Sequence, residues 1–250
     1  MADERLQHEA ESPWSGEHYF RYDEVQKHIQ PNDRVLDIAC GTGYGTHRIT
    51  QYTTGEVIGG DIAAEAVETC KKTWQAPNLD FRVLDGTRLD FPDGYFDRIV
   101  SFETIEHTTA YRQMIAEFAR VLKPSGTLIL STPNSAITSP DGIVPNPYHT
   151  QEFRPDELKG ILQEAFPHVE LYGQRYIRYK QGGKGNGAGK VLETLFLSFG
   201  IRKLPYSLRS GVMKTLFKHP LYPMGSDFAL ASDPAVILKE CPVLFAVCKK

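Results

Sequence analysis

The chain has 250 residues, of which 41% are hydrophobic and 24% are charged, and its formal net charge is -3. This length suits one large domain, or one domain with an insertion, and allows a sizeable core. The slight acidic excess argues against a protein held mainly by nucleic-acid phosphates, because such binding needs a broad excess of Lys and Arg. We therefore expect no nucleic-acid partner.

Four scattered cysteines without a CxxC pair argue against a zinc knuckle and favour a reduced intracellular compartment. The first five residues, MADER, are polar and lack the apolar run of a signal peptide. No stretch approaches the roughly 18 apolar residues of a membrane span. We expect a cytoplasmic protein without a transmembrane segment. Apolar residues within 192–199 allow peripheral membrane contact, although a core helix face explains them equally well, and a homodimer is compatible with the sequence.

Strands and helices alternate through the first half of the chain. Apolar residues at helical spacing predict a helix over 18–29, after a loosely ordered segment 1–17. Strands are then expected over 35–39, 57–60, 81–84, 96–101 and 127–131, helices over 44–53, 63–74 and 111–122, and a tight turn at 123–126. This alternation favours an α/β fold with a doubly wound, mostly parallel sheet and helices on both faces.

The second half is less regular. Residues 133–150 contain four prolines and predict a long loop, which is a length that is usually functional or disordered. Later expected elements are a helix starting at 154–158, a strand at 169–172 and a last strand at 243–247 that returns to the sheet. Five glycines within 182–189 indicate a flexible loop or linker, and the segment that follows, to about 232, reads as an insertion with some helix.

The first chemical signal is the segment from Asp37 to Gly45. A predicted strand ends in an acid, and three alternate glycines then let the backbone turn sharply and lie against a ligand. Doubly wound folds hold nucleotides at this place. The spacing is G-x-G-x-G, not the G-x-G-x-x-G dinucleotide fingerprint, and Asp37 would repel a pyrophosphate. Both details favour a cationic ligand over NAD, with a tight turn that binds nothing as the alternative.

Two further acids follow the next strands. Asp61 closes the second strand, where a carboxylate can accept both hydroxyls of a ribose. Asp85 follows the third strand, where it could accept a hydrogen bond from an adenine amino group, and a turn or helix-cap role explains it equally well. Three acids at successive strand ends indicate an adenosine-type ligand.

Together these motifs resemble those of the class I S-adenosylmethionine-dependent methyltransferases. The resemblance covers roughly residues 18–175 and includes segments 96–107 and 120–126. It implies a Rossmann-like methyltransferase fold with a seven-stranded sheet, an N-terminal helix, an insertion in the C-terminal half, and S-adenosylmethionine as cofactor. The domain would span 18–250, with an acceptor-side loop at 133–153 and an insertion at 182–232.

The resemblance also implies a set of cofactor-binding residues on the N-terminal segment and at four strand ends. This set is Arg21, Asp37, Ala39, Gly41, Gly43, Tyr44, Asp61, Ile62, Asp85, Gly86, Phe102 and Glu103. Within it, the methionine moiety falls near Asp37, Ala39 and Gly41, the ribose on Asp61 and the adenine on Asp85. The arginine would meet the carboxylate of the cofactor.

A finer resemblance is to a bacterial subgroup linked with glycan or glycolipid assembly, whose members are sugar O-methyltransferase-like. It rests on segments 101–107, 146–153 and 172–175, and it implies a sugar, glycan or glycolipid hydroxyl as acceptor. A quinone, lipid or other small molecule is the alternative acceptor, because such enzymes have related Glu-His segments. The rivals of other classes are a NAD-dependent oxidoreductase and a non-catalytic module that binds a partner through its insertion.

Transfer to a hydroxyl needs a general base, because a sugar hydroxyl is a poor nucleophile near neutral pH. His149 is the first candidate, since imidazole titrates near the operating pH and this residue lies on the expected acceptor-side loop. His107 and Glu106, just after the fourth strand, come second. These three residues could also gather with Glu103 and Glu152 around a divalent ion, for which oxygen ligands favour Mg²⁺. Their spacing is not diagnostic, so the sequence assigns no metal ligand.

Overall fold

The computed structural model describes residues 14–177, 210–211, 215 and 222–250. Contacts divide the chain into two compact units. Tyr22–Arg175 and Leu230–Lys250 make up most of the first unit, whereas the second combines Ala10–Arg21 with Tyr176–Ala229. The glycine-rich loop and most of the insertion predicted for 182–232 lie outside the described residues.

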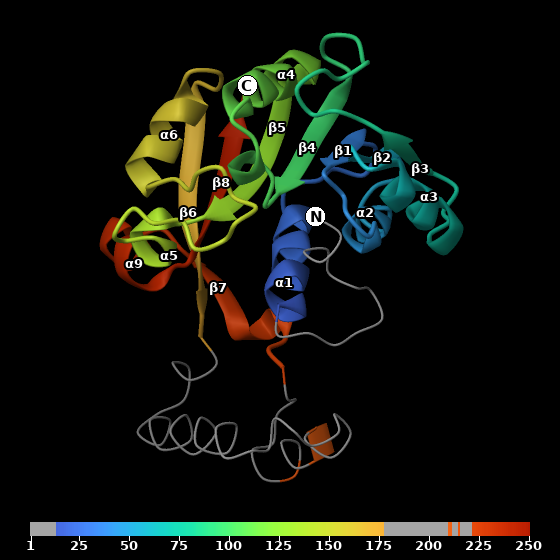
Figure 1. Cartoon of the computed structure of the whole chain (residues 1–250). Coiled ribbons are helices and arrows are strands. Elements are labelled where there is room, and N and C mark those ends of the chain that lie inside the picture. Colours follow the sequence, from blue (N-terminus) through green and yellow to red (C-terminus); the bar gives the residue numbers. More distant parts are fainter. Residues whose placement is uncertain (1–13, 178–209, 212–214, 216–221) are drawn as a thin grey trace. The chain divides into compact units, whose positions relative to one another are not determined.

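The core of the fold is an eight-stranded sheet with the strand order β3-β2-β1-β4-β5-β8-β6-β7 (Figure 1). Its strands are β1 (Val35–Ile38), β2 (Val57–Asp61), β3 (Leu79–Val83), β4 (Phe96–Phe102), β5 (Leu122–Pro133), β6 (His168–Tyr176), β7 (Phe228–Ala231) and β8 (Val243–Lys249). Strands β1 to β5 pair in parallel, and β8 runs antiparallel to both β5 and β6. The predicted doubly wound, mostly parallel sheet is confirmed. It has one strand more than the seven expected, because β7 forms within the stretch predicted as an insertion.

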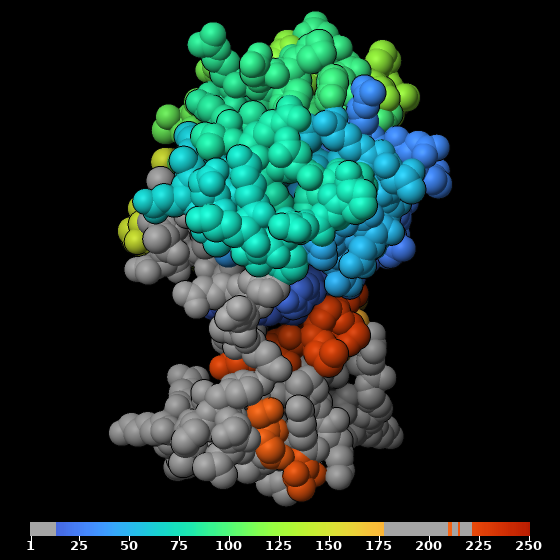
Figure 2. Space-filling view, turned by 90° about the vertical axis from the view of Figure 1, so that its right-hand side faces the viewer, coloured from blue at the N-terminus to red at the C-terminus, as the bar shows by residue number. Residues whose placement is uncertain are grey.

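Helices cover both faces of this sheet. They are α1 (Ser15–Gln26), α2 (Tyr44–Ile49), α3 (Ala64–Thr73), α4 (Tyr111–Val121), α5 (Ser135–Thr138), α6 (Pro155–Gln163) and α9 (Pro234–Glu240), with short 3-10 turns η2 (Ile105–His107) and η5 (Gly225–Asp227). Successive side chains of β1 point to opposite faces. Val35 belongs to the buried cluster that includes Ile49 of α2, whereas Leu36 belongs to the cluster that includes Phe118 of α4 and Leu162 of α6. The β3 edge of the sheet, with α3 beside it, belongs to the surface seen in Figure 2.

The strand order reverses between β1 and β4. From β1 the chain passes outward to β2 and β3, and then returns to place β4 on the other side of β1. The register pairs Ile38 with Gly60, Asp61 with Val83 and Phe102 with Ser131, so the carboxyl ends of the parallel strands share one rim. Such a switch point leaves a crevice at that rim, where open α/β sheets bind their ligands.

Several local predictions differ from the structure. The helix expected over 18–29 spans Ser15–Gln26, and the loop expected over 133–150 contains α5. The turn expected at 123–126 lies inside β5, because Phe96 pairs with Leu122 and Arg98 with Thr127, so four residues bulge between the two pairs. Helix α2 ends at Ile49, short of residue 53. The chain turns back early because hydroxyls of the threonines that follow α2 bond to carbonyls of the loop before β1.

In the second unit, the first part of α1 packs against the segment that leads into β7. The Phe228 ring lies 6.2 Å from that of Phe20 and 5.5 Å from that of Tyr176. A Cβ on Gly16 would come within 2.2 Å of the Pro223 carbonyl oxygen, so only glycine allows this approach. Within the described part of the chain, no helix is long and apolar enough to cross a membrane.

The central position of β8 predicts a large effect of Leu244→Ala. Leu244 is 0% exposed in the main core, whereas Leu238 of α9 is 40% exposed. Truncating the buried leucine should lower the free energy of unfolding by about 2–5 kcal/mol, because the removed methyl groups leave a cavity. Urea denaturation measures the loss, and Leu238→Ala is the matched control, for which we expect about 1 kcal/mol or less. Equal losses in the two variants would contradict this packing.

Candidate functional site

The loop after β1 has left-handed backbone conformations at alternate residues. Ala39, Gly41 and Gly43 have φ values of 63°, 57° and 75°. A Cβ on Gly43 would lie 2.7 Å from the Cys70 sulfur and 2.9 Å from the Phe81 ring, so this position requires glycine for space as well as for conformation. Ala39 adopts the strained region without being glycine, and it is exposed at the rim.

The side chain of Asp61 holds this loop from the neighbouring strand. Its Oδ2 accepts a hydrogen bond from the Gly41 backbone N–H at 3.0 Å, and its Oδ1 accepts one from the Ala63 N–H at 2.9 Å. From α3's carboxyl end, the Trp74 indole Nε1 donates to the Thr42 carbonyl oxygen at 2.8 Å. The glycine-rich loop is therefore fixed from two sides by contacts outside itself.

Asp37 is buried beneath the loop, with 1% of its surface exposed. Thr46 Oγ1 donates to its Oδ2 at 2.6 Å, and the Tyr22 hydroxyl donates to both oxygens at 3.2–3.3 Å. Burial raises the pKa of Asp37 to about 7, although the Thr46 and Tyr22 hydrogen bonds pull it down, and the charge of Asp61 raises it further. A positively charged ligand next to this carboxyl would favour its ionised form.

The third strand end is more open. Asp85 is exposed, and its Oδ1 accepts hydrogen bonds from the backbone N–H and the hydroxyl of Thr87 at 2.8 and 2.7 Å, so the structure shows the turn role. A role in adenine binding stays a prediction. Ile62 is 64% exposed beside Asp61 and presents apolar surface at the rim. Gly86 is buried, and a Cβ there would lie 3.1 Å from the Met114 side chain.

At the exit of β4, Phe102 and Glu103 face different partners. The Phe102 ring lies edge-on to the ring of Tyr22, with 5.1 Å between the ring centroids. The Tyr44 ring also lies edge-on to the ring of Tyr22, at 5.4 Å. Glu103 is the second non-glycine residue with a left-handed backbone, at φ 50°. Its Oε1 accepts a hydrogen bond from Ser131 Oγ at 2.7 Å. Each of the two strands that flank the switch point, β1 and β4, is therefore followed directly by a non-glycine residue with a left-handed backbone conformation.

Arg21 is fully buried in α1 and belongs to the second compact unit. Its predicted contact with the cofactor carboxylate stays a prediction. All other members of the predicted cofactor-binding set belong to the first unit, at or next to the carboxyl ends of β1 to β4.

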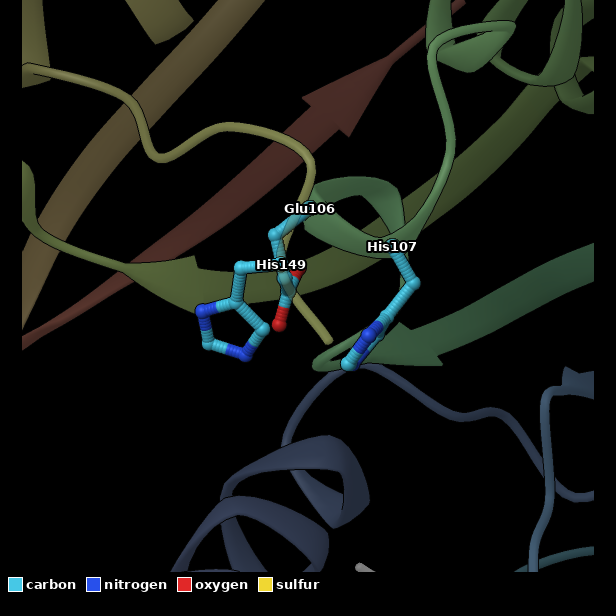
Figure 3. Close-up of side chains that lie close together, drawn as sticks. All are labelled: Glu106, His107 and His149. Atoms are coloured by element: carbon cyan, nitrogen blue, oxygen red, sulfur yellow. The ribbon is translucent and has the colours of Figure 1, made fainter. Parts of the chain in front are cut away.

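The three predicted catalytic residues come together from distant parts of the chain. Glu106 and His107 lie in η2, and His149 lies in the loop after α5. One ligand atom of each lies within 4.8 Å of those of the other two, and the two imidazole rings stand edge to face at 4.8 Å. Figure 3 shows the three side chains directed into a common space.

His149 is oriented through both ring nitrogens. Its Nδ1 lies 2.9 Å from Glu152 Oε1, and its Nε2 lies 2.9 Å from the side-chain Nδ2 of Asn146. The Asn146 Oδ1 accepts from the Tyr148 backbone N–H at 3.0 Å, which turns the amide nitrogen toward the ring. The carboxylate can only accept, so Nδ1 carries the proton and Nε2 carries the lone pair.

Glu152 is held ionised in this arrangement. Burial tends to raise the pKa of Glu152, but hydrogen bonds from Thr138, His149 and Ser139 outweigh it and leave the pKa below its ordinary value. Its link to His149 spans three positions in the sequence, which is a spacing that could have indicated the pair. From sequence alone, Glu152 is instead expected among the possible ligands of an ion.

The loop that carries His149 is fastened to η2 by backbone bonds that the sequence does not reveal. The Thr150 N–H donates to the Glu106 carbonyl oxygen at 2.7 Å. Gln151 Nε2 donates to the carbonyl oxygens of Ile105 and Thr108 at 2.9 and 3.0 Å. These contacts hold the two histidines in one cluster.

The raised pKa of Asp37 predicts a pH dependence of stability. Because its folded-state pKa lies near 7 and its ordinary value is 3.8, the folded state keeps a proton that the unfolded state releases between those values. Stability should therefore fall as pH rises from about 4 to about 7. Asp37→Asn lacks this titrating group. Between pH 4 and pH 8 its free energy of unfolding should therefore rise by roughly 3–4 kcal/mol relative to that of wild type. Urea midpoints measure it, with exposed Asp90→Asn as the control; identical pH profiles of wild type and Asp37→Asn would refute it.

Comparisons with known proteins agree with this geometry. Residues 36–130 match the model of a methyltransferase domain family. A probable S-adenosylmethionine-dependent methyltransferase of Mycolicibacterium smegmatis is 34% identical over 161 residues, which cover 64% of this chain and 61% of that protein. The O-methyltransferase cnsE of Penicillium expansum is 28% identical over 153 residues, which cover 57% of this chain and 55% of that protein. The chain thus spans about three fifths of the length of the mycobacterial relatives that it matches.

Solved structures show the same fold. The YcgJ protein of Bacillus subtilis superposes with a TM-score of 0.58 at 19% identity, covering 93% of this chain and 99% of that one. The similarity to this structure concerns the fold alone. The methyltransferase domain model matches residues from β1 into β5, and this stretch includes the strand ends that form the rim. Over residues 36–130 the chain is therefore similar to methyltransferase domains, among them those of probable S-adenosylmethionine-dependent enzymes.

Proposed function

We propose that this protein transfers the methyl group of S-adenosylmethionine to an acceptor hydroxyl. The observation that carries the proposal is the rim at the switch point, where Asp61 holds a left-handed glycine loop beside the buried carboxyl of Asp37. When bound, the cofactor supplies a sulfonium methyl group that is reactive by itself. The task of the protein is to bind it, align the acceptor and receive the proton.

The chemistry of the rim fits this cofactor. A carboxylate offers about four acceptor sites, so Asp61 can bond ribose hydroxyls in addition to the two backbone N–H groups that it binds. The exposed Ile62 gives an adenine ring an apolar surface to lie on. Asp37 suits the cationic end of the cofactor, because its ionisation is suppressed in the free protein and a nearby positive charge restores it.

On the acceptor side, we assign the base to His149. Its Nδ1–H is held by Glu152, which stabilises the imidazolium that forms when Nε2 takes a proton. Nε2 faces the Asn146 amide in the structure, so an acceptor hydroxyl must replace that amide as hydrogen-bond partner. His107 and Glu106 are the second candidates for the base, because each has a polar side-chain atom within 4.8 Å of one on His149.

We propose a sugar, glycan or glycolipid hydroxyl as the acceptor. In its support, Tyr148 is 43% exposed directly beside His149, and an aromatic face is a common platform for a sugar ring. The same loop exposes 70% of Ile143, which suits a lipid or quinone tail and keeps that class as the alternative. A panel of sugars, glycolipids and quinols, incubated with a methyl-labelled cofactor and read by mass spectrometry, separates the two.

Removing the charge of Asp61 should weaken cofactor binding. We expect Asp61→Asn to bind S-adenosylhomocysteine roughly 10–100-fold less tightly, because the charge-assisted hydrogen bonds to the ribose and to the loop are lost. Isothermal titration measures the affinity, and exposed Asp90→Asn is the matched control with unchanged affinity. Wild-type protein that is stabilised by NADH and not by S-adenosylhomocysteine would overturn the proposed cofactor.

Removing the His149 imidazole should slow turnover without loss of the cofactor. We expect His149→Ala to lower kcat by about 10²–10⁴-fold, which is the typical contribution of a general base, and to keep the S-adenosylhomocysteine affinity. The rate is measured with the acceptor that the panel identifies. His168→Ala, at an exposed position that starts β6, should keep full activity. An unchanged rate in His149→Ala would show that another group takes the proton.

A further inference from the structure

We propose that Glu106, His107 and His149 form a binding site for one divalent transition-metal ion of the Zn²⁺ type. Their ligand atoms lie within 4.8 Å of one another, and the side chains converge from two separate segments (Figure 3). Two imidazole nitrogens and one carboxylate oxygen are a ligand set that leaves coordination positions open for water or a substrate.

Each of the three side chains is oriented by a contact through its other polar atom. His107 Nδ1 lies 3.1 Å from the Tyr148 carbonyl oxygen, and His149 Nδ1 lies 2.9 Å from Glu152 Oε1. Both partners can only accept, so both Nδ1 atoms carry protons and both Nε2 atoms carry lone pairs. Metal-bound histidines are oriented by such outer contacts to carbonyls and carboxylates.

The carboxylate follows the same pattern. Thr132 Oγ1 donates to Glu106 Oε2 at 2.8 Å, and we assign Oε1 to the ion. Glu106 is 0% exposed, which favours partners that are charged, because a buried carboxylate loses its hydration. For Glu106 and His107 the assigned ligand atoms thus differ from the atoms that hold the side chain in the contacts above, whereas Nε2 of His149 also meets the Asn146 amide.

The site requires a modest rearrangement to close on an ion. With metal bonds of about 2.0–2.1 Å in tetrahedral geometry, two ligand atoms lie about 3.4 Å apart, so atoms up to 4.8 Å apart must approach each other by up to about 1.4 Å. His149 Nε2 must also leave the Asn146 amide nitrogen, 2.9 Å away. His107 and Asn146 are both only partly buried, which leaves their side chains room to turn.

The donor set favours a transition metal over Mg²⁺. The sequence suggests five candidate ligand residues with mostly oxygen donors. In the structure, however, the Glu103 carboxylate accepts a hydrogen bond from Ser131, and the Glu152 carboxylate pairs with the ring of His149. Two of the three remaining ligands are imidazoles, which suit Zn²⁺ and its neighbours, whereas Mg²⁺ prefers carboxylates and water.

The consequence for catalysis rests on the proposed function. An ion at this place could bind the acceptor hydroxyl and lower its pKa, as metal ions do for bound water, so that the hydroxyl proton would pass to solvent water. His149 Nε2 would then donate its lone pair to the ion and could not take the proton, so base and ligand are alternative roles of one atom. Binding itself can be tested without turnover.

The test uses the full, untagged chain, freed of metal with EDTA and dialysed. Titration with Zn²⁺ should show one equivalent bound, and Co²⁺ should give the visible absorption of a low-coordinate N/O site. His107→Ala, His149→Ala and Glu106→Gln should each weaken Zn²⁺ binding at least tenfold, and His168→Ala should bind like wild type. Circular dichroism and S-adenosylhomocysteine affinity, both unchanged, show that the variants are folded.

Three results would overturn the proposal. They are the absence of stoichiometric Zn²⁺ binding in wild type, Zn²⁺ affinities of the three ligand variants that equal that of wild type, and binding of Mg²⁺ in preference to Zn²⁺. Asp61→Asn separates this site from the cofactor site. It should lose S-adenosylhomocysteine and keep Zn²⁺, so that a failure of the proposed cofactor leaves the metal result interpretable.

Discussion

The rim of the sheet depends on one carboxylate that accepts hydrogen bonds from two backbone N–H groups. Asp61 sits at the end of β2 and accepts the N–H of Gly41 from the loop after β1 and the N–H of Ala63 from the start of α3. Charge-assisted hydrogen bonds of this kind are stronger than neutral ones, and both are shielded because Asp61 is 5% exposed. The left-handed turn at Gly41 persists because this residue holds its N–H group.

Placing acids at adjacent strand ends has an electrostatic cost in the absence of a cation. Asp37 and Asp61 raise one another's energy when both are ionised, and burial of Asp37 adds to the effect. The protein limits this cost with hydroxyl donors from Tyr22 and Thr46. A positively charged ligand offsets the electrostatic cost that these donors leave. The repulsion between the acids in the free protein therefore favours binding of a sulfonium or ammonium compound.

The acceptor side follows a different logic, because its groups come from two segments that only the fold brings together. The loop after α5 is tied to η2 by backbone bonds from Thr150 and by the Gln151 amide. That fastening sets the distance between His107 and His149, whereas Glu152 sets the tautomer of His149. Whether the pair works as a base or as a metal site, the same second contacts supply the orientation.

Sequence patterns alone determined the order and type of most elements and the acids at the first three strand ends, because strand length, glycine turns and helical spacing are local properties of the chain. Sequence could not show that Asp85 is engaged in a turn with Thr87, that residues 123–126 bulge within β5, or that Phe228–Ala231 adds an eighth strand. The tertiary structure also decided which partner each histidine has. The Tyr148 carbonyl reaches the ring of His107 across 41 positions of sequence, and no local pattern encodes a contact between segments so far apart, whereas the contacts of His149 to Asn146 and Glu152 each span three positions.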